Sequence, residues 1–188
     1  MASECGNLSF ISPVPNSNSV IAGVALKGLW SNSSGTTWSQ LGVGAGSEVI
    51  TNRPAWISYD PANPAIFYES GIYNGGGVYK TINGGLTFQR LGSNVGHIDF
   101  VSVDYTDPNR QTLLAGGHEQ ARTVWKSTDG GQNWTNIGLN LPAGTGFSTS
   151  PLVINAQTYV VNTDTSWSGG TPGIYRTVNG GTTWTKTA

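Results

Sequence analysis

Short segments of alternating apolar and polar residues recur along the chain, and glycine-rich turns separate them. Residues 78–80 (VYK) and 87–89 (TFQ) flank one such turn, and residues 124–126 (VWK) and 133–135 (NWT) flank another. Alternation with a period of two on both sides of a Gly-rich turn predicts a β-hairpin. The segments between the hairpins lack the 3.6-residue periodicity of an amphipathic helix. The pattern therefore predicts an all-β protein.

The turn belongs to an eight-residue motif that occurs four times. Each copy begins with a hydroxyl residue, has a short polar residue two places on and a Gly four places on, and ends with an aromatic residue. The copies start 50, 46 and 50 residues apart, and a fixed period of this size indicates a repeat architecture. The copies, which we call the repeat turns, are residues 31–38 (SNSSGTTW), 81–88 (TINGGLTF), 127–134 (STDGGQNW) and 177–184 (TVNGGTTW).

The residue types of the motif suit a tight bend. Asn83, Asp129 and Asn179 are expected to bond the backbone two residues on, and the glycines after them reach left-handed conformations at little steric cost. The first copy departs from this pattern, because Ser33 and Ser34 replace the Asn-Gly pair. Its turn is therefore expected to be the loosest.

Each repeat also supplies two apolar segments ahead of the hairpin, separated by a polar turn. The turns of the first three repeats contain Pro15, Pro61 and Pro108, which are 46 and 47 residues apart and support the same period. About sixteen short strands are expected, which favours a β-propeller of four four-stranded blades; a β-sandwich is the alternative. The expected blades of this single domain are about residues 1–46, 47–92, 93–140 and 141–188.

The sequence leaves open how such a ring closes. The chain is expected to begin with the first strand of one blade and to end after the last strand of another. Four blades lie at the lower limit for a closed propeller. A set that does not close leaves two apolar faces, which usually find a partner. The favoured expectation is a part of a larger propeller or a homo-oligomer that completes the ring.

The repeated motif resembles the Asp-box, or BNR repeat, of sialidases and related β-propellers. The resemblance covers nearly the whole chain and implies that each motif joins the third and fourth strands of a blade. Only Asp129 matches the acidic position of the family, whereas Ser33, Asn83 and Asn179 depart from it. The resemblance therefore concerns the turn rather than a conserved charge.

Strand alternation sorts the connections onto two faces. The turns between first and second strands and the repeat turns should share one side, the turn face, with Asp104 and Asp107. The loops between second and third strands and the connections between blades should share the other, the loop face, whose centre binds substrate in the resembled family. Eight candidate binding residues lie in these loops. They are Arg53, Trp56, Glu69, Tyr73, His97, His118, Arg122 and Trp167.

Carboxylates beside exposed aromatic rings are typical of carbohydrate sites. Glycoside hydrolysis usually needs two carboxyl groups, and Asp99 and Glu119 are the candidate catalytic pair, with Asp164 third. For any one residue, the alternative is an ordinary loop or packing role. The predicted function is a glycan-directed propeller that binds carbohydrate or resembles a glycoside hydrolase. The alternative is a structural or protein-interaction propeller without catalytic activity, so whether the protein is an enzyme stays open.

Sialidase activity itself is not expected. The family's N-terminal Arg-Ile-Pro motif is missing, and Arg53-Pro54 resembles it only weakly. Its three clustered arginines cannot be assigned in this chain. Tyr73 near Glu69 resembles the tyrosine nucleophile of the family by proximity alone.

Composition narrows the partners. Only 10% of residues are charged and the net charge is −1, and the scattered Arg and Lys argue against nucleic acid. No apolar run approaches a membrane span, and the low charge suggests a secreted, extracellular or periplasmic protein. Cys5 is the only cysteine, so an internal disulfide is impossible. Two histidines without a ligand motif predict neither a metal site nor a cofactor.

Overall fold

In the computed structural model, which describes residues 6–188, the chain forms four antiparallel four-stranded sheets. Each sheet uses four strands consecutive in sequence, and we call the sheets blades 1 to 4. The only named helical element of the described residues is the 3₁₀ turn η2 (Gly138–Asn140). The expected all-β fold with four strands per repeat is confirmed. Cys5 lies outside the described residues.

Within every blade the strands pair in chain order, and the fourth strand is only two residues long. Blade 1 contains β1 (Leu8–Pro13), β2 (Val20–Val24), β3 (Gly28–Asn32) and β4 (Ser39–Gln40). Blade 2 contains β5 (Arg53–Tyr59), β6 (Phe67–Ile72), β7 (Gly77–Thr81) and β8 (Gln89–Arg90). Blade 3 contains β9 (Ile98–Val103), β10 (Leu113–Gly117), β11 (Val124–Ser127) and β12 (Thr135–Asn136). Blade 4 contains β13 (Phe147–Asn155), β14 (Thr158–Asp164), β15 (Gly173–Thr177) and β16 (Thr185–Lys186).

The repeat turns of blades 2 to 4 share one hydrogen-bond pattern, as blade 2 illustrates. The Thr81 hydroxyl accepts from the Gly85 amide at 3.0 Å and donates to Asn83 Oδ1 at 2.9 Å. Asn83 Oδ1 also accepts from the Thr87 amide at 3.0 Å. The third residue of the motif therefore bonds the backbone four residues on, and the expected bond two residues on is wrong.

The turn of blade 1 follows the same scheme with a register shift. Here Asn32, rather than Ser31, accepts from the Ser34 and Gly35 amides, at 3.1 and 2.6 Å. Sheet pairing agrees, because Asn32 lies opposite Val20 as Thr81 lies opposite Phe67. The motif of blade 1 thus begins at residue 32 and is one residue shorter, and the alignment that starts it at Ser31 is wrong.

The repeat turns lie on the same side of the sheets as the turns between first and second strands. The amides of Gly84, Gly130 and Gly180 donate to carbonyls of that neighbouring turn at 2.8–3.0 Å. The shared turn face is therefore confirmed. These bonds stay within one blade, so they are set largely by local sequence.

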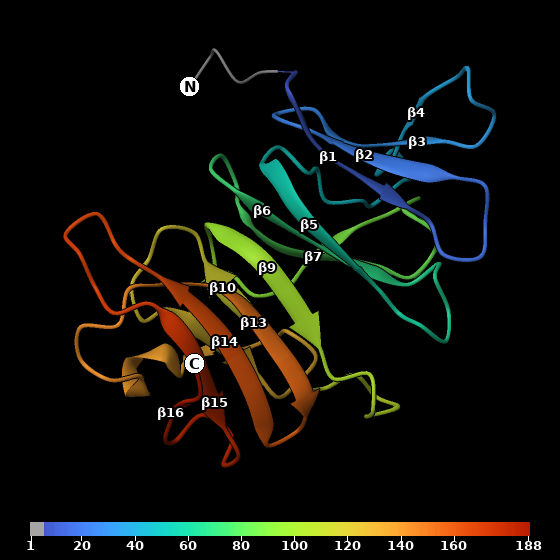
Figure 1. The fold of residues 1–188 in the computed structure, drawn as a ribbon. Coiled ribbons are helices and arrows are strands. Elements are labelled where there is room, and N and C mark those ends of the chain that lie inside the picture. Colours follow the sequence, from blue (N-terminus) through green and yellow to red (C-terminus); the bar gives the residue numbers. More distant parts are fainter. Residues whose placement is uncertain (1–5) are drawn as a thin grey trace.

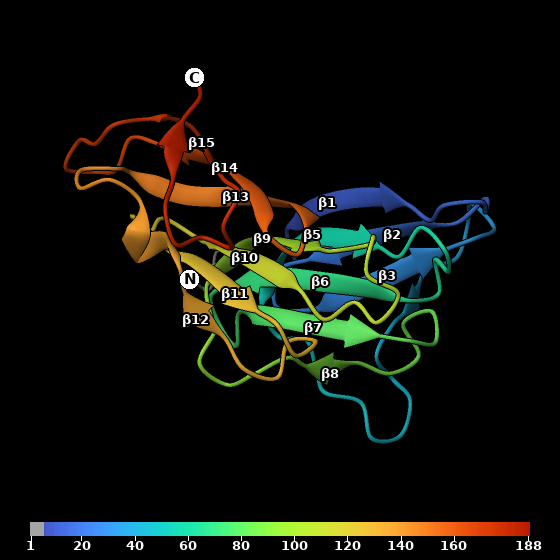
Figure 2. The same ribbon diagram turned by 90° about the horizontal axis from the view of Figure 1, so that it is seen from below.

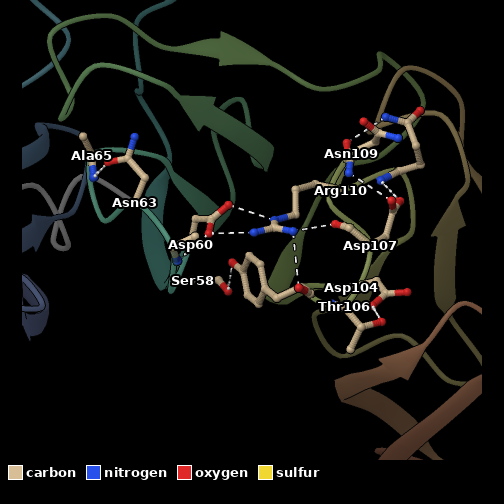
Figure 3. A network of polar contacts seen from close by, with 12 residues as sticks. Ser58, Asp60, Asn63, Ala65, Asp104, Thr106, Asp107, Asn109 and Arg110 are labelled. Atoms are coloured by element: carbon tan, nitrogen blue, oxygen red, sulfur yellow. Dashed lines mark hydrogen bonds and ion pairs between the residues drawn. The ribbon is translucent and has the colours of Figure 1, made fainter.

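A charged network also crosses the turn face between blades 2 and 3. Arg110 binds both carboxylate oxygens of Asp60, at 2.8 and 3.0 Å, and its third nitrogen reaches the Tyr105 and Asp107 carbonyls (Figure 3). Donation from Arg110 lowers the pKa of Asp60, and a fork of this geometry is a strong charge-assisted contact. Asp104 caps its own turn by accepting from Thr106. Asp104 and Asp107 thus lie on the turn face, as expected.

The apolar core lies between the blades rather than within one of them. Blades 1 and 2 enclose a cluster that includes Leu29, Phe67 and Phe88, and similar clusters lie between blades 2 and 3 and between blades 3 and 4. The aromatic residue that ends each repeat turn of blades 2 to 4 is buried in them. Burial of such a side chain contributes about 1.5–3 kcal/mol.

The four blades follow one another in an open arc. Figure 1 shows this series from blade 1, in blue, to blade 4, in orange and red. Successive blades pack together, whereas within residues 6–188 the strands of blade 4 do not pack extensively on those of blade 1. Figure 2 gives the arrangement from below. Among the described residues, the model contains no helix with the length and apolar character of a membrane span.

Candidate functional site

The centre of the loop face is organised around His118, which follows β10. Its Nδ1 lies 2.9 Å from Asp99 Oδ1 on β9. Its Nε2 lies 3.3 Å from the Tyr73 hydroxyl, after β6, and 3.8 Å from Glu119 Oε1. A carboxylate only accepts, so Nδ1–H donates to Asp99, and Nε2 of the neutral ring then accepts from Tyr73. Three segments of blades 2 and 3 meet at this imidazole.

His97 completes the cluster from the connection between the two blades. The Tyr73 ring stands edge-on to His97 and to His118, with ring centres 5.0 and 5.5 Å apart. The His118 amide donates to the His97 carbonyl at 2.7 Å, which ties the connection to the loop. Packing and backbone bonding together fix the orientation of all three rings.

The backbone of this cluster, and of Arg122 in the same loop as Glu119, is held in sparsely populated conformations. Tyr73, His97, Glu119 and Arg122 have φ of 57°, 55°, 51° and 53°. Left-handed backbone is uncommon for non-glycine residues, and each such residue costs on the order of 1–3 kcal/mol. Four of them in adjoining loops show that the surrounding blades hold these side chains in place at the expense of local strain.

A small hollow opens beside the cluster. Its volume is about 220 Å³. Burial raises the pKa of the Asp99 carboxyl, and the neighbouring His118 opposes this shift. The hollow therefore combines a cationic side chain, a carboxylate and an imidazole with apolar side chains. It is lined by Ser9, Arg53, Pro54, Ala55, Ile72, Asp99 and His118.

A second hollow, of about 270 Å³, lies along the innermost strands of blades 2, 3 and 4. The Trp56 side chain, which is 45% exposed, lies against Phe100 with ring centres 5.1 Å apart. Ser58 and Ser102 place hydroxyls on the same wall. Consecutive residues of β5 and β9 line the two hollows: Ala55 and Asp99 line the polar one, and Trp56 and Phe100 line the aromatic one.

The remaining candidates lie elsewhere. Glu69 is 0% exposed inside the interface between blades 1 and 2, where Asn52 donates to it at 3.4 Å. The prediction that Glu69 lies in an exposed loop and binds substrate is therefore wrong. Glu69 lies on β6, which turns its side chain towards blade 1. Asp164 and Trp167 lie on blade 4, where Trp167 contacts Phe147 at 5.8 Å between ring centres. Arg122 extends to the Leu139 carbonyl instead of joining His118.

Phe100 and Ser9 are among the lining residues that sequence reasoning missed. Phe100 lies in the middle of an apolar strand, where alternation alone cannot separate a core position from an exposed one. Ser9 comes from blade 1 and reaches the hollow only because that blade packs on blade 2. Among residues 6–188, no three His, Cys, Asp or Glu side chains group as metal ligands would.

Comparison with known proteins addresses the fold. No family model matches the chain, and no curated protein is detectably similar in sequence. The xyloglucanase of glycoside hydrolase family GH74 from Xanthomonas campestris superposes with a TM-score of 0.66 at 17% identity, over 98% of this chain and 31% of that one. The fold is a β-propeller.

Other solved propellers agree. The Niastella koreensis GH74 enzyme has a TM-score of 0.63 and 22% identity, over 94% of this chain and 28% of the enzyme. YCF48 bound to the D1 peptide has a TM-score of 0.52 and 21% identity, over 72% of this chain and 40% of YCF48. The chain thus spans about a third or less of the GH74 chains. At these identities the likeness concerns architecture alone.

Proposed function

We propose that this chain is a glycan-directed Asp-box propeller that binds carbohydrate along β5 and β9 on the loop face. One observation carries the proposal: neighbouring residues of β5 and β9 line both the polar hollow of Arg53, Asp99 and His118 and the aromatic hollow of Trp56. A sugar presents apolar C–H faces and polar hydroxyls together, and it binds where an aromatic plane adjoins hydrogen-bonding groups.

The assigned roles follow from the geometry. Trp56 provides the stacking surface, supported from beneath by Phe100. Asp99 accepts hydroxyl hydrogen bonds at the oxygen that His118 leaves open, and Arg53, which lines the same hollow, donates to the ligand. The Tyr73 contact holds His118 still, so the polar groups need little rearrangement when a ligand arrives.

The placement of Asp99 and Glu119 favours binding over hydrolysis. The two carboxylates approach opposite nitrogens of His118, at 2.9 and 3.8 Å. The imidazole therefore lies between the oxygens, where a two-carboxylate mechanism places the sugar. If the protein is nevertheless a hydrolase, Asp99→Asn or Glu119→Gln should reduce turnover of aryl glycosides by orders of magnitude.

The fold likeness to a GH74 xyloglucanase supports xyloglucan as the first test ligand. Titration calorimetry with xyloglucan oligosaccharides and a panel of soluble polysaccharides should detect binding to the wild-type chain. Trp56→Ala and Asp99→Asn should each weaken it at least about tenfold, the equivalent of 1.4 kcal/mol. Trp167→Ala on blade 4 is the matched aromatic control and should bind normally. Loss in Trp167→Ala with retention in Trp56→Ala would move the site to blade 4.

The second candidate function is a protein-interaction propeller, favoured by the exposed apolar surfaces at both ends of the arc. YCF48, which shares the architecture, was solved with a bound peptide. If the wild-type chain neither binds any glycan of the panel nor hydrolyses the aryl glycosides, this alternative is supported. The low charge favours a secreted or periplasmic location in either case, and fractionation of the source cells would test it.

A further inference from the structure

The two ends of the arc expose positions that every internal interface buries. The aromatic residue that ends the repeat turn is 3–8% exposed in Phe88, Trp134 and Trp184, where it packs on the preceding blade. Its equivalent in blade 1, Trp38, is 42% exposed. Trp38 and five other side chains line an apolar hollow on the outer face of blade 1. The others are Leu8, Ile11, Ala22, Val24 and Trp30.

The space around the last glycine of each repeat turn also differs between blade 1 and the other blades. A Cβ on Gly85, Gly131 or Gly181 would come within 2.5–2.8 Å of a Leu or Ile side chain that follows the last strand of the preceding blade. The equivalent Gly35 of blade 1 has nothing within 4 Å of that point. The outer face of blade 1 thus leaves open a position that a Leu or Ile side chain fills at each internal interface.

Blade 4 shows the complementary surface. The residue immediately before the third-strand aromatic is buried at 0–1% exposure in Leu29, Val78 and Val124, where the following blade covers it. Its equivalent on blade 4, Ile174, is 40% exposed. Leu152 is 54% exposed, and it replaces the serines that bond the next blade elsewhere, as Ser102 accepts from the Val153 amide. An apolar surface of this kind marks an interaction site.

We propose that a second copy of this chain covers both surfaces, with blade 4 of each copy packed on blade 1 of the other. The occupant must present a blade face, because each free surface is one half of an interface that the chain forms three times internally. One copy carries both missing halves. A contact of this head-to-tail type closes when the rotation allows, and two four-bladed arcs give eight blades, within the usual range of four to eight.

The internal interfaces predict one contact of this assembly. Lys126 of blade 3 donates to the Gly180 carbonyl in the repeat turn of blade 4 at 3.1 Å. Arg176 occupies the same position on the free face of blade 4, two residues after Ile174. It should therefore reach the repeat turn of blade 1 in the second copy, near Ser34.

Sedimentation equilibrium of the wild-type chain tests the proposal. The expected mass is twice the 19.7 kDa of the single chain. Trp38→Asp and Ile174→Asp should each shift the protein to monomer at concentrations where the wild type is dimeric. Ile82→Asp is the matched control, since Ile82 is 66% exposed on an internal blade, and it should stay dimeric. A wild type that remains monomeric up to millimolar concentration overturns the proposal.

Mixing the two variants separates head-to-tail assembly from other dimers. In an equimolar mixture, unmodified blade 4 of Trp38→Asp meets unmodified blade 1 of Ile174→Asp, so association should return. If identical faces paired instead, one of the two variants would stay dimeric alone and mixing would restore nothing. Circular dichroism of each variant confirms that it is folded, as expected for substitutions at exposed positions.

Discussion

The turn face and the loop face of the blades use polar residues in opposite ways. On the turn face, hydrogen bonds within each repeat satisfy the polar groups of the repeat turns. Arg110 also binds both carboxylate oxygens of Asp60. On the loop face, Tyr73, His97 and Glu119 are held at positive φ around the His118 imidazole, whose side chain is 16% exposed. Positive φ occurs on both faces, since Arg110 has a φ of 53°. The faces differ in their polar groups: the turn face pairs them with one another, whereas on the loop face Asp99 and His118 line a hollow that a ligand can enter. The contacts of the turn face are therefore expected to stabilise the fold, and those of the loop face to bind a ligand.

Breaking the Arg110–Asp60 pair should have the largest effect. Arg110→Ala leaves the Asp60 carboxylate, whose side chain is 5% exposed, without its partner. Removal of one member of a buried pair costs about 3 kcal/mol or more, so the free energy of unfolding in urea should fall by that order. The double variant Asp60→Ala/Arg110→Ala should lose less than the sum of the single variants. Additivity would show that the network contributes little to the turn face.

Glu69, buried beneath the loop-face ends of blades 1 and 2, should respond to pH. Burial raises the pKa of this carboxyl to about 8, while the Asn52 contact opposes the shift. Because the folded pKa exceeds the unfolded one, the folded state keeps a proton that the unfolded chain releases, and stability falls as pH rises from about 4.5 to 8. Glu69→Gln should therefore stabilise the protein at pH 7 by on the order of 2–3 kcal/mol.

The same substitution supplies its own control at low pH. Near pH 4 both states of the wild type carry the proton, so Glu69→Gln should unfold at the wild-type urea concentration. Equal stabilisation at pH 4 and pH 7 would assign the effect to packing rather than to ionisation of Glu69.

The repeat turns offer a matched pair of serines with a smaller effect. Ser127→Ala removes the hydroxyl that accepts from the Gly131 amide at 2.9 Å and donates to Asp129 at 2.8 Å. The expected cost is about 1 kcal/mol. Ser31→Ala, at the position that the sequence motif equates with Ser127, should cost far less, because Asn32 takes that role in blade 1. Equal costs would restore the alignment that starts at Ser31.

The smallest change in stability is expected at the loop face. Asp99→Asn should alter the free energy of unfolding by no more than about 0.5 kcal/mol, while glycan affinity falls at least tenfold. Parallel urea titration and calorimetry on the same preparation measure both quantities. A large loss of stability with unchanged affinity would make Asp99 a structural residue and remove the contrast between the two faces.

Much of the architecture could be predicted from the residues because it depends on contacts close in sequence. The hydroxyl, polar and glycine positions of residues 81–85 bend the chain through bonds that span four residues or fewer. Alternation on either side then sets four strands per repeat. The register of blade 1 was misread for the same local reason, since Ser31 and Asn32 can both begin the motif and only sheet pairing selects between them.

The sequence by itself thus determined the number of blades, the strand order and the two faces, because hairpin turns and alternation act over a few residues. Only the tertiary structure decided that Tyr73, Asp99 and His118 meet, and that Glu69 turns inward. It also decided which apolar side chains the two ends of the arc expose. These features arise from packing between blades, which brings together residues far apart in sequence. The hydrogen bond between the Ser58 and Tyr105 hydroxyls, for example, spans 47 residues. No local pattern encodes which blade faces cover one another.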